Sequence, residues 1–349
     1  MTDQPRVHDP KVPGGLVLGP DVEVDVPAGG GQMFDRAVPT DSSGLTYEYG
    51  LEIEARSQWG YARRRFMRHR LAVVSVVVLT GIFAAGIFAN YIAPYSYKEI
   101  PYITIAGTSV IDTSQILAHP SRQHLFGTDS AGRDTFSRTL YGIRTSARVG
   151  IFVGLLSTLI GTIIGGLAGF YGGWSDNLLM RMTDLFLTLP LLAVLLTASK
   201  FLDSSTPTTL AILIACLIWT SIARIVRGVF LSLREKEYVE AARAAGAGDL
   251  RIMLRHMIPN SVGPIVVAAT LTIGTAIALE ATLSFLGFGI RPPTPALGAL
   301  LDEGQEAGLD KWWLVTYPGL LIVLIILCIN FIGDGLRDAL DPTQRRVRA

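Results

Sequence analysis

Long apolar runs alternate with short charged stretches along this chain of 349 residues. The hydrocarbon core of a bilayer requires about 20 predominantly apolar residues for each helix that crosses it. The pattern therefore predicts an all-α polytopic membrane protein with six transmembrane helices. They are expected near residues 71–93, 147–171, 186–202, 208–225, 262–288 and 315–334. The third run is the weakest candidate, because Pro190 lies near its start and Lys200 and Asp203 lie at its end.

The first apolar run begins near Leu71, which is too far from the N-terminus for a cleaved signal peptide. We therefore expect it to remain in the protein as a span. Ahead of it, residues 1–55 are rich in Pro, Gly, Asp and Val and show neither helical nor strand periodicity. This composition predicts a disordered tail, to which the sequence assigns no role.

Basic residues cluster in three polar segments: "YARRRFMRHR" at 61–70, the loop at 224–255, and "QRRVRA" at 344–349. Cytoplasmic loops carry an excess of Lys and Arg, and six spans place all three segments on one side. Both termini are therefore expected in the cytoplasm. The predicted order is a cytoplasmic tail (1–55), a basic lead-in (56–70), a first span (71–93), an extracytoplasmic loop (94–146), a core of five spans with a cytoplasmic loop at 225–260 (147–342), and a basic tail (343–349).

One basic cluster opposes this topology, because it falls on the outer side: Arg133, Arg138, Arg144 and Arg148. Three cytoplasmic clusters outweigh it, and Asp129 and Asp134 partly offset its charge. The placement of residues 128–148 stays open at this point.

A stripe of small residues recurs at spacings of three or four in the second run: Gly150, Gly154, Ser157, Gly161, Gly165 and Gly169. Small residues on one helix face let two backbones approach closely, which is how helices associate in lipid. We expect the stripe to pack inside this chain. Lining a pore or contacting a second membrane subunit are the alternatives.

Composition and motifs exclude several functions. Half of the residues are apolar and only 17% are charged, outside the usual range of soluble domains. The net charge of +1 is uninformative, because the charges are segregated along the chain, and no nucleic-acid partner is implied. A phosphate-binding GxxxxGK[ST] loop, HExxH, GxSxG and clustered metal ligands are all missing from the sequence. The chain is therefore not expected to be an enzyme or to bind a cofactor or metal, and any nucleotide must bind to another subunit.

Two acidic residues near the ends of the expected spans are candidate pathway or gate residues. Charges at membrane depth usually face a cavity, a partner charge or the interface. Glu280 lies roughly 27 Å along its helix from Val262, near the outer end. It is expected to reach water or pair with Arg291, with a pathway-lining position as the alternative. Asp334 lies near the cytoplasmic exit, where a structural role is favoured.

The polar loop between the fourth and fifth expected spans contains two short helical patterns. Residues 236–245 are good helix formers, and Glu240 can pair with Arg243 at i,i+3. Gly246 supplies a stop. Asp249 is placed to cap a second helix that ends before Pro259.

The first of these helices is rich in alanines that are expected to be exposed: Ala241, Ala242, Ala244 and Ala245. Alanines add little bulk, so such a helix fits into a groove on another protein. An amphipathic helix resting on lipid is the alternative.

The stretch "EYVEAARAAGAGDLRIMLRHMIPN" at 237–260 resembles the EAA loop of bacterial ABC-importer permeases. The matching positions are Glu240, Ala241, Ala242, Gly246, Ile258 and Pro259. In that family the loop forms a coupling helix that sits in a cleft of the cytoplasmic ATPase. The resemblance thus implies that Glu240, Ala241, Ala242 and Gly246 contact the ATPase or shape the contacting turn. Asp249 and Pro259 complete the coupling segment.

Further segments resemble the C-type subunit of the dipeptide/oligopeptide permeases. They are "RRRFMRHRLAVV" before the first span, "IAPY" at its end, "HLFGTDSAGRDTFSRTLYGIRTS" at 124–146, "GFYGGWSDNLLMRMTDLFLTLP" at 169–190, "EATLSFLGFGIRPPTPALGALL" at 280–301 and "FIGDGLRDALDP" at 331–342. The resemblance runs from about residue 57 to 342. The tail at 1–55 lies outside it.

The resemblance implies a type I ABC-importer permease fold in the bacterial inner membrane. The expected partners are a homologous permease subunit, one or two ATPases that use ATP-Mg, and an extracytoplasmic peptide-binding protein. Uptake of nickel chelates or another small solute, a proton-coupled secondary transporter, and a membrane-anchored scaffold are the alternatives. Peptide length and side-chain preference do not follow from the sequence.

Overall fold

The computed structural model describes residues 46–48, 51–53, 58–105, 108–202 and 206–341. The chain divides into two compact units, residues 1–56 and 57–349. In the first unit, β1 (Thr46–Glu48) pairs antiparallel with β2 (Leu51–Ile53). The rest of the tail predicted at 1–55 lies outside the described residues.

The second unit is a bundle of helices. They are α1 (Gln58–Arg68), α2 (Arg70–Ile87), α3 (Ala89–Ile92), α4 (Thr135–Tyr171), α5 (Gly173–Thr188), α6 (Leu191–Phe201), α7 (Pro207–Arg234), α8 (Glu237–Ala244), α9 (Asp249–Ile252), α10 (Ile258–Phe285), α11 (Leu297–Glu306) and α12 (Trp312–Leu340). An antiparallel hairpin of β3 (Tyr102–Ile105) and β4 (Thr108–Ile111) lies between α3 and α4.

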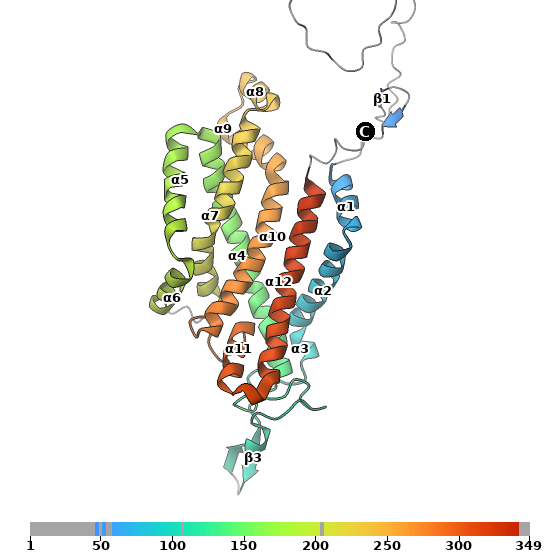
Figure 1. The fold of residues 1–349 in the computed structure, drawn as a ribbon, viewed down its shortest axis with the longest axis vertical. Helices are drawn as coiled ribbons and strands as arrows, with labels where there is room; N and C mark the ends of the chain where they lie inside the picture. Colours follow the sequence, from blue (N-terminus) through green and yellow to red (C-terminus); the bar gives the residue numbers. More distant parts are fainter. Residues whose placement is uncertain (1–45, 49–50, 54–57, 106–107, 203–205, 342–349) are drawn as a thin grey trace, which may run out of the picture. The chain divides into compact units, whose positions relative to one another are not determined.

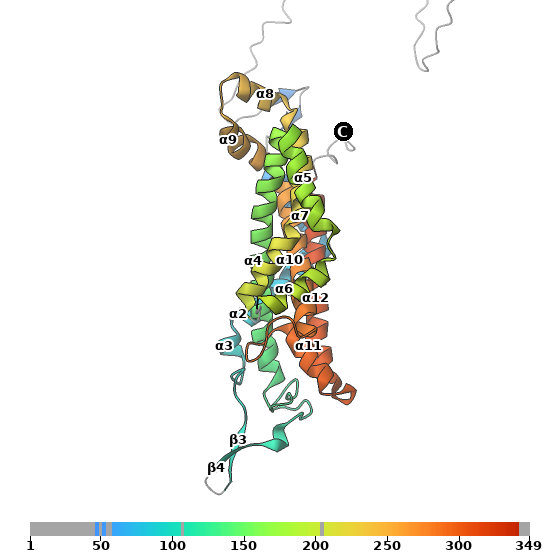
Figure 2. The same ribbon diagram turned by 90° about the vertical axis from the view of Figure 1, so that its left-hand side faces the viewer.

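The long helices run side by side and define two ends of the bundle. Figures 1 and 2 both show α8 and α9 at one end, and α11 with β3 and β4 at the other. Within the described residues, five helices are long and apolar enough to cross a membrane: α2, α4, α7, the continuous α9–α10 segment and α12. Counting the bent pair α5–α6 as one span brings the total to six. The predicted all-α polytopic fold is therefore confirmed.

The third span differs from the prediction. It consists of α5 and α6, which meet at an angle of 83°, so it begins at Gly173 rather than at 186. Proline has no N–H and disfavours a helical conformation in the residue before it. Pro190 therefore breaks the span near its middle, with extended backbone at Leu189 and Pro190.

The loop predicted at 94–146 is also shorter than expected. Helix α4 already begins at Thr135, because the Asp134 carboxylate accepts a hydrogen bond of 2.8 Å from the backbone N–H of Ser137. A side-chain acceptor at this position satisfies an N–H of the first turn that has no partner inside the helix. Residues 135–146 are therefore part of the helix.

The stripe of small residues on α4 packs inside this chain, as expected. A Cβ atom added at Gly165 would overlap the carbonyl of Ala223 on α7, and one at Gly154 would overlap Ile273 on α10. At Gly169 it would lie 2.6 Å from the Cβ of Phe230. The stripe thus lets α4 lie close to the backbone of α7 and accommodates side chains of α10.

Candidate functional site

The loop between α7 and α10 turns sharply after α8. Gly246 has φ +80°, a left-handed conformation that favours glycine. Its N–H donates to the carbonyl of Arg243 (2.9 Å), and the N–H of Ala247 donates to that of Ala242 (3.0 Å). This pair of bonds is the Schellman motif, which satisfies the last carbonyls of a helix. The predicted helix and its stop at Gly246 are confirmed.

Asp249 does not cap the second helix, so that prediction is wrong. Gly248 is the N-cap residue and already has an extended conformation, with φ −70° and ψ 155°. Asp249 is consequently the first residue inside α9. Its carboxylate still lies at the positive end of the helix dipole, where negative charge is stabilising.

Pro259 does not end the second helix either. After α9, a π-helical turn at Met253–Met257 leads directly into α10, and Pro259 lies in the first turn of α10. The wider turn accommodates the missing proline N–H. The side chain of Asn260 donates to the carbonyl of His256 (2.6 Å). Pro259 therefore marks where the loop joins the span.

A buried apolar cluster fixes α8 to the bundle. Val239, Ile252 and Met257 are fully buried and belong to one cluster with Phe170 of α4 and Phe230 of α7. Burial of such side chains is the main source of the attachment, since it removes apolar area from water. A displacement of α8 would therefore be transmitted to α4, α7 and α10 through side chains in direct contact.

The opposite face of α8 is exposed. Glu240, Ala241, Ala244 and Ala245 face outward, whereas Ala242 is half-buried. The expected exposure of the alanines is thus confirmed except at Ala242. The ion pair between Glu240 and Arg243 is absent, because the Arg243 guanidinium lies over the Phe170 ring, 5.5 Å from its centre.

An open hollow of about 450 Å³ lies beside this turn. Its lining residues are Tyr238, Ala242, Ala245, Gly246, Ala247, Arg251, Arg255 and His256. Ala242 and Gly246 thus share one surface, while Glu240, Ala241, Asp249 and Pro259 lie outside its lining. We call this surface the α8 groove.

The α8 groove is basic. Arg251 and Arg255 both line it, and no carboxylate does. Partial desolvation raises the pKa of the Tyr238 phenol further above its ordinary value, and the phenol is a hydrogen-bond donor on the surface of the groove. Tyr238, Arg251 and Arg255 are not among the residues predicted from the sequence, although the i,i+4 spacing of the two arginines places them on one helix face. The groove suits acidic and hydrogen-bond-accepting groups of a partner.

Glu280 does not reach water or pair with Arg291, so the expectation for it is wrong. It is fully buried, and its carboxyl group accepts hydrogen bonds from Ser146 on α4 (2.7 Å) and from Ser284 (2.9 Å). The chain after α10 folds back over it, and the N–H of Leu297 lies 3.5 Å from the Ser146 hydroxyl. Asp334 is exposed on α12.

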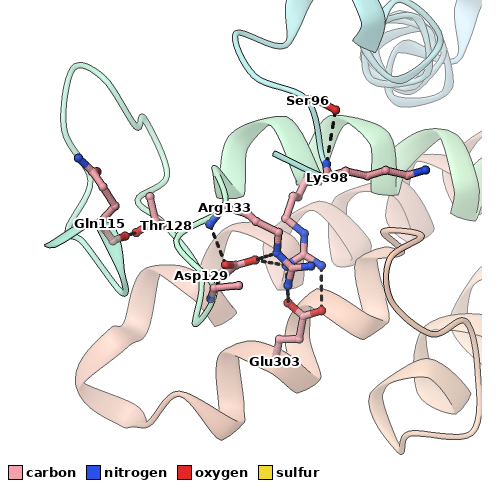
Figure 3. A network of polar contacts seen from close by, with 9 residues as sticks. Ser96, Lys98, Gln115, Thr128, Asp129, Arg133 and Glu303 are labelled. Atoms are coloured by element: carbon pink, nitrogen blue, oxygen red, sulfur yellow. Dashed lines mark hydrogen bonds and ion pairs between the residues drawn. The ribbon is translucent and has the colours of Figure 1, made fainter. Parts of the chain in front are cut away.

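A second polar site lies at the end of the bundle opposite α8 (Figure 3). The guanidinium of Arg138 donates to both carboxylate oxygens of Glu303 on α11, and Nη2 lies 2.8 Å from Oε1. Its Nη1 also donates to Asp129. The carboxylate of Asp129 accepts a further hydrogen bond of 2.7 Å from Arg133. We call these four side chains the α11 ion network.

The α11 ion network accommodates two of the four opposing arginines, Arg133 and Arg138. Arg133 and Arg138 are neutralised by Asp129 and Glu303. The predicted offset by Asp129 is therefore confirmed, whereas Asp134 bonds to His124 (2.9 Å) and caps α4. The sequence could not identify Glu303, because it lies 165 residues from Arg138.

Comparisons with known proteins cover most of the chain. Residues 161–346 match the family model "Binding-protein-dependent transport system inner membrane component". Residues 57–110 match the model "N-terminal TM domain of oligopeptide transport permease C".

Several curated proteins are similar over more than four fifths of this chain. The oligopeptide transport system permease protein OppC of Mycobacterium tuberculosis is 37% identical over 288 residues, which are 82% of this chain and 94% of that protein. The dipeptide permease DppC of Alkalihalophilus pseudofirmus is 38% identical, covering 84% and 93%. The glutathione permease GsiD of Escherichia coli is 39% identical, covering 83% and 92%. A solved structure of the MetNI methionine ABC transporter in an inward-facing conformation aligns with TM-score 0.46 and 21% identity, over 57% of this chain and 94% of that one.

Proposed function

Since this chain belongs to the family of binding-protein-dependent transport system inner membrane components, as an OppC-type permease of ABC importers, we propose that it imports peptides. It is a multi-pass protein of the inner membrane and contains no ATPase domain. ATP is used by the partner ATPases of such a complex, and permeases of this family bind no cofactor.

The α8 groove is the observation that carries the proposal for coupling. In our proposal a cytoplasmic ATPase docks on α8 and its turn, and contacts Glu240, Ala241, Ala242 and Gly246. Asp249 and Pro259 hold the segment that joins this turn to α10. The exposed small side chains allow close approach, and Arg251 and Arg255 attract acidic groups.

Coupling then follows from the packing below α8. The cluster around Val239, Ile252 and Met257 connects α8 with α4, α7 and α10. Closure of the ATPases on ATP would shift α8, and these helices would rock between inward-open and outward-open states. Nucleotide drives this exchange only if it changes the relative free energies of the two states.

The proposed orientation places the α8 end in the cytoplasm, together with both termini. Three observations support it: the basic α8 groove, the arginines of α1 at the same end, and the neutralisation of Arg133 and Arg138 at the other end. We place a homologous permease subunit beside this chain, and an extracytoplasmic binding protein at the α11 end. Glu280 and Asp334 remain proposed gate residues.

The peptide substrate is supported by the names of the similar proteins, which include oligopeptide, dipeptide and glutathione permeases. Glutathione is itself a small peptide, and it is the second substrate to test. Competition with unlabelled dipeptides, longer peptides and glutathione in uptake measurements identifies the class. Nickel uptake without peptide uptake would contradict the proposal.

The coupling proposal is tested in the assembled importer with Ala242→Glu and, separately, Gly246→Val. We expect each variant to insert into the membrane at normal levels and to lose ATP-dependent peptide uptake. Gly228→Ala on α7 is the control, because no atom lies within 4 Å of the added Cβ. Normal uptake by both groove variants would remove the coupling assignment.

A further inference from the structure

Four exposed arginines lie where α1 meets the first span, at the same end of the bundle as α8 (Figure 1). They are Arg63, Arg64 and Arg68 of α1, and Arg70, the first residue of α2. In the part of the chain that the structure describes, none of them forms an ion pair with a carboxylate. We call them the arginine row.

The orientation of α1 is fixed by contacts on its other face. The Arg65 guanidinium donates a hydrogen bond of 3.0 Å to the carbonyl of Asp341 at the end of α12. The ring of Phe66 packs against Gly335 of α12, because a Cβ atom added at Gly335 would lie 3.2 Å from the ring. Since successive residues of a helix are turned by about 100°, the face with Arg64 and Arg68 points away from α12.

The nearby acidic groups lie on the α12 side. Asp338 lies 4.0 Å from Nε2 of His69, and the backbone of Asp341 is already in contact with Arg65. The other charged side chains at this end of α12 are Asp334 and Arg337, and within the described residues neither forms an ion pair with the arginine row. The acidic groups of α12 therefore leave the arginine row without a counter-charge.

The arginine row ends where an exposed apolar surface begins. The side chains of Met67, Leu71 and Val74 are all more than half exposed, at 60%, 57% and 58%. On a transmembrane helix such side chains face lipid acyl chains. The arginines thus lie at the depth of the lipid headgroups, and a guanidinium binds a phosphate group bidentately.

We propose that the arginine row binds the phosphate groups of anionic phospholipids in the leaflet at the α8 end. The arginine row adjoins an apolar surface that faces lipid, and this favours a lipid over an acidic protein as its ligand. Juxtamembrane basic residues each strengthen attachment to an anionic surface by about fivefold in affinity. The site would hold α1, and through Phe66 the end of α12, at a fixed depth in the membrane.

The test uses the full chain purified in detergent. It is incubated with phosphatidylglycerol or with phosphatidylcholine of the same acyl chains, and bound lipids are counted by native mass spectrometry. We expect the chain to retain phosphatidylglycerol in preference to phosphatidylcholine. Arg64→Gln combined with Arg68→Gln should lower this preference about 5- to 30-fold, since two charges are removed.

The matched control is Arg122→Gln combined with Arg291→Gln, two exposed arginines near the α11 end. It should keep the preference. Arg64→Lys with Arg68→Lys keeps the charge but removes the bidentate geometry, and an intermediate loss is expected. Equal retention of both lipids by the wild type, or an equal loss in both Gln variants, would overturn the proposal. Displacement of the lipid by inorganic phosphate, but not by chloride at the same ionic strength, would also overturn the proposal, because the site would then bind a soluble anion.

Discussion

Arg138 on α4 and Glu303 on α11 form a bidentate ion pair, although they lie 165 residues apart. The Arg138 side chain is only 1% exposed. Removing one partner of a buried ion pair leaves an uncompensated charge and costs about 3–5 kcal/mol. The pair, with Asp129, therefore attaches the loop before α4 and the start of α4 to α11.

Glu303→Ala should lower the melting temperature of the purified chain. Asp129 remains as a partner for Arg138, so we expect a loss near the lower end of that range, about 3 kcal/mol. Glu306→Ala is the control, because Glu306 is exposed on the same helix. Similar melting temperatures of the two variants would show that the ion pair does not stabilise the fold.

Glu280→Gln should leave the melting temperature close to that of the wild type, and a clearly lower melting temperature would contradict this expectation. The glutamine amide can still accept from one serine and donate to the other, because hydroxyl groups rotate. Glu280→Leu should destabilise the chain, since each unpaired buried hydroxyl costs about 1–3 kcal/mol. Loss of uptake in a stable Glu280→Gln variant would instead support the proposed gate role. Thermal unfolding and uptake are measured on the same preparations.

Gly165→Ala should destabilise the contact between α4 and α7 by about 1–3 kcal/mol, because the added Cβ overlaps the carbonyl of Ala223. Gly81→Ala on α2 is the same substitution at a position where no atom lies within 4 Å of the new Cβ. It should be neutral or stabilise by up to about 1 kcal/mol, owing to the higher helix propensity of Ala. Equal melting temperatures of the two variants would contradict the close packing of α4 on α7.

Asp302→Asn should raise the melting temperature at neutral pH. Burial, together with Glu306 and Glu303, raises the pKa of the Asp302 carboxyl above its ordinary value. A raised pKa means that the folded state binds the proton more tightly than the unfolded state does. Protonated Asp302 therefore favours folding at pH values below the pKa of the unfolded state, and this stabilisation is lost as the pH rises through the pKa of the folded state. The difference between variant and wild type should therefore shrink as the pH is lowered below the ordinary range of Asp. A difference that grows toward low pH would contradict this sign.

Much of the loop between α7 and α10 could be predicted from the sequence because its determinants are local. A run of good helix formers followed by Gly246 specifies α8 and its stop, and hydrogen bonds between residues three to five apart complete the motif. The errors at Asp249 and Pro259 are also local in position. However, both predictions depended on how the chain continues from α9 into α10. The packing of α9 and α10 in the bundle decides this continuation.

The sequence by itself determined which segments enter the membrane, because the length of an apolar run must match the thickness of the bilayer. It also determined that α4 packs closely, since a stripe of small residues leaves space on one helix face. Only the tertiary structure decided the partners of the charged residues. Burial of Glu280 by the chain after α10, and neutralisation of Arg138 by Glu303, depend on segments that are distant in sequence. The free energy of a buried charge is set by whichever group folding brings within hydrogen-bond distance, and spacing along the chain does not contain that information.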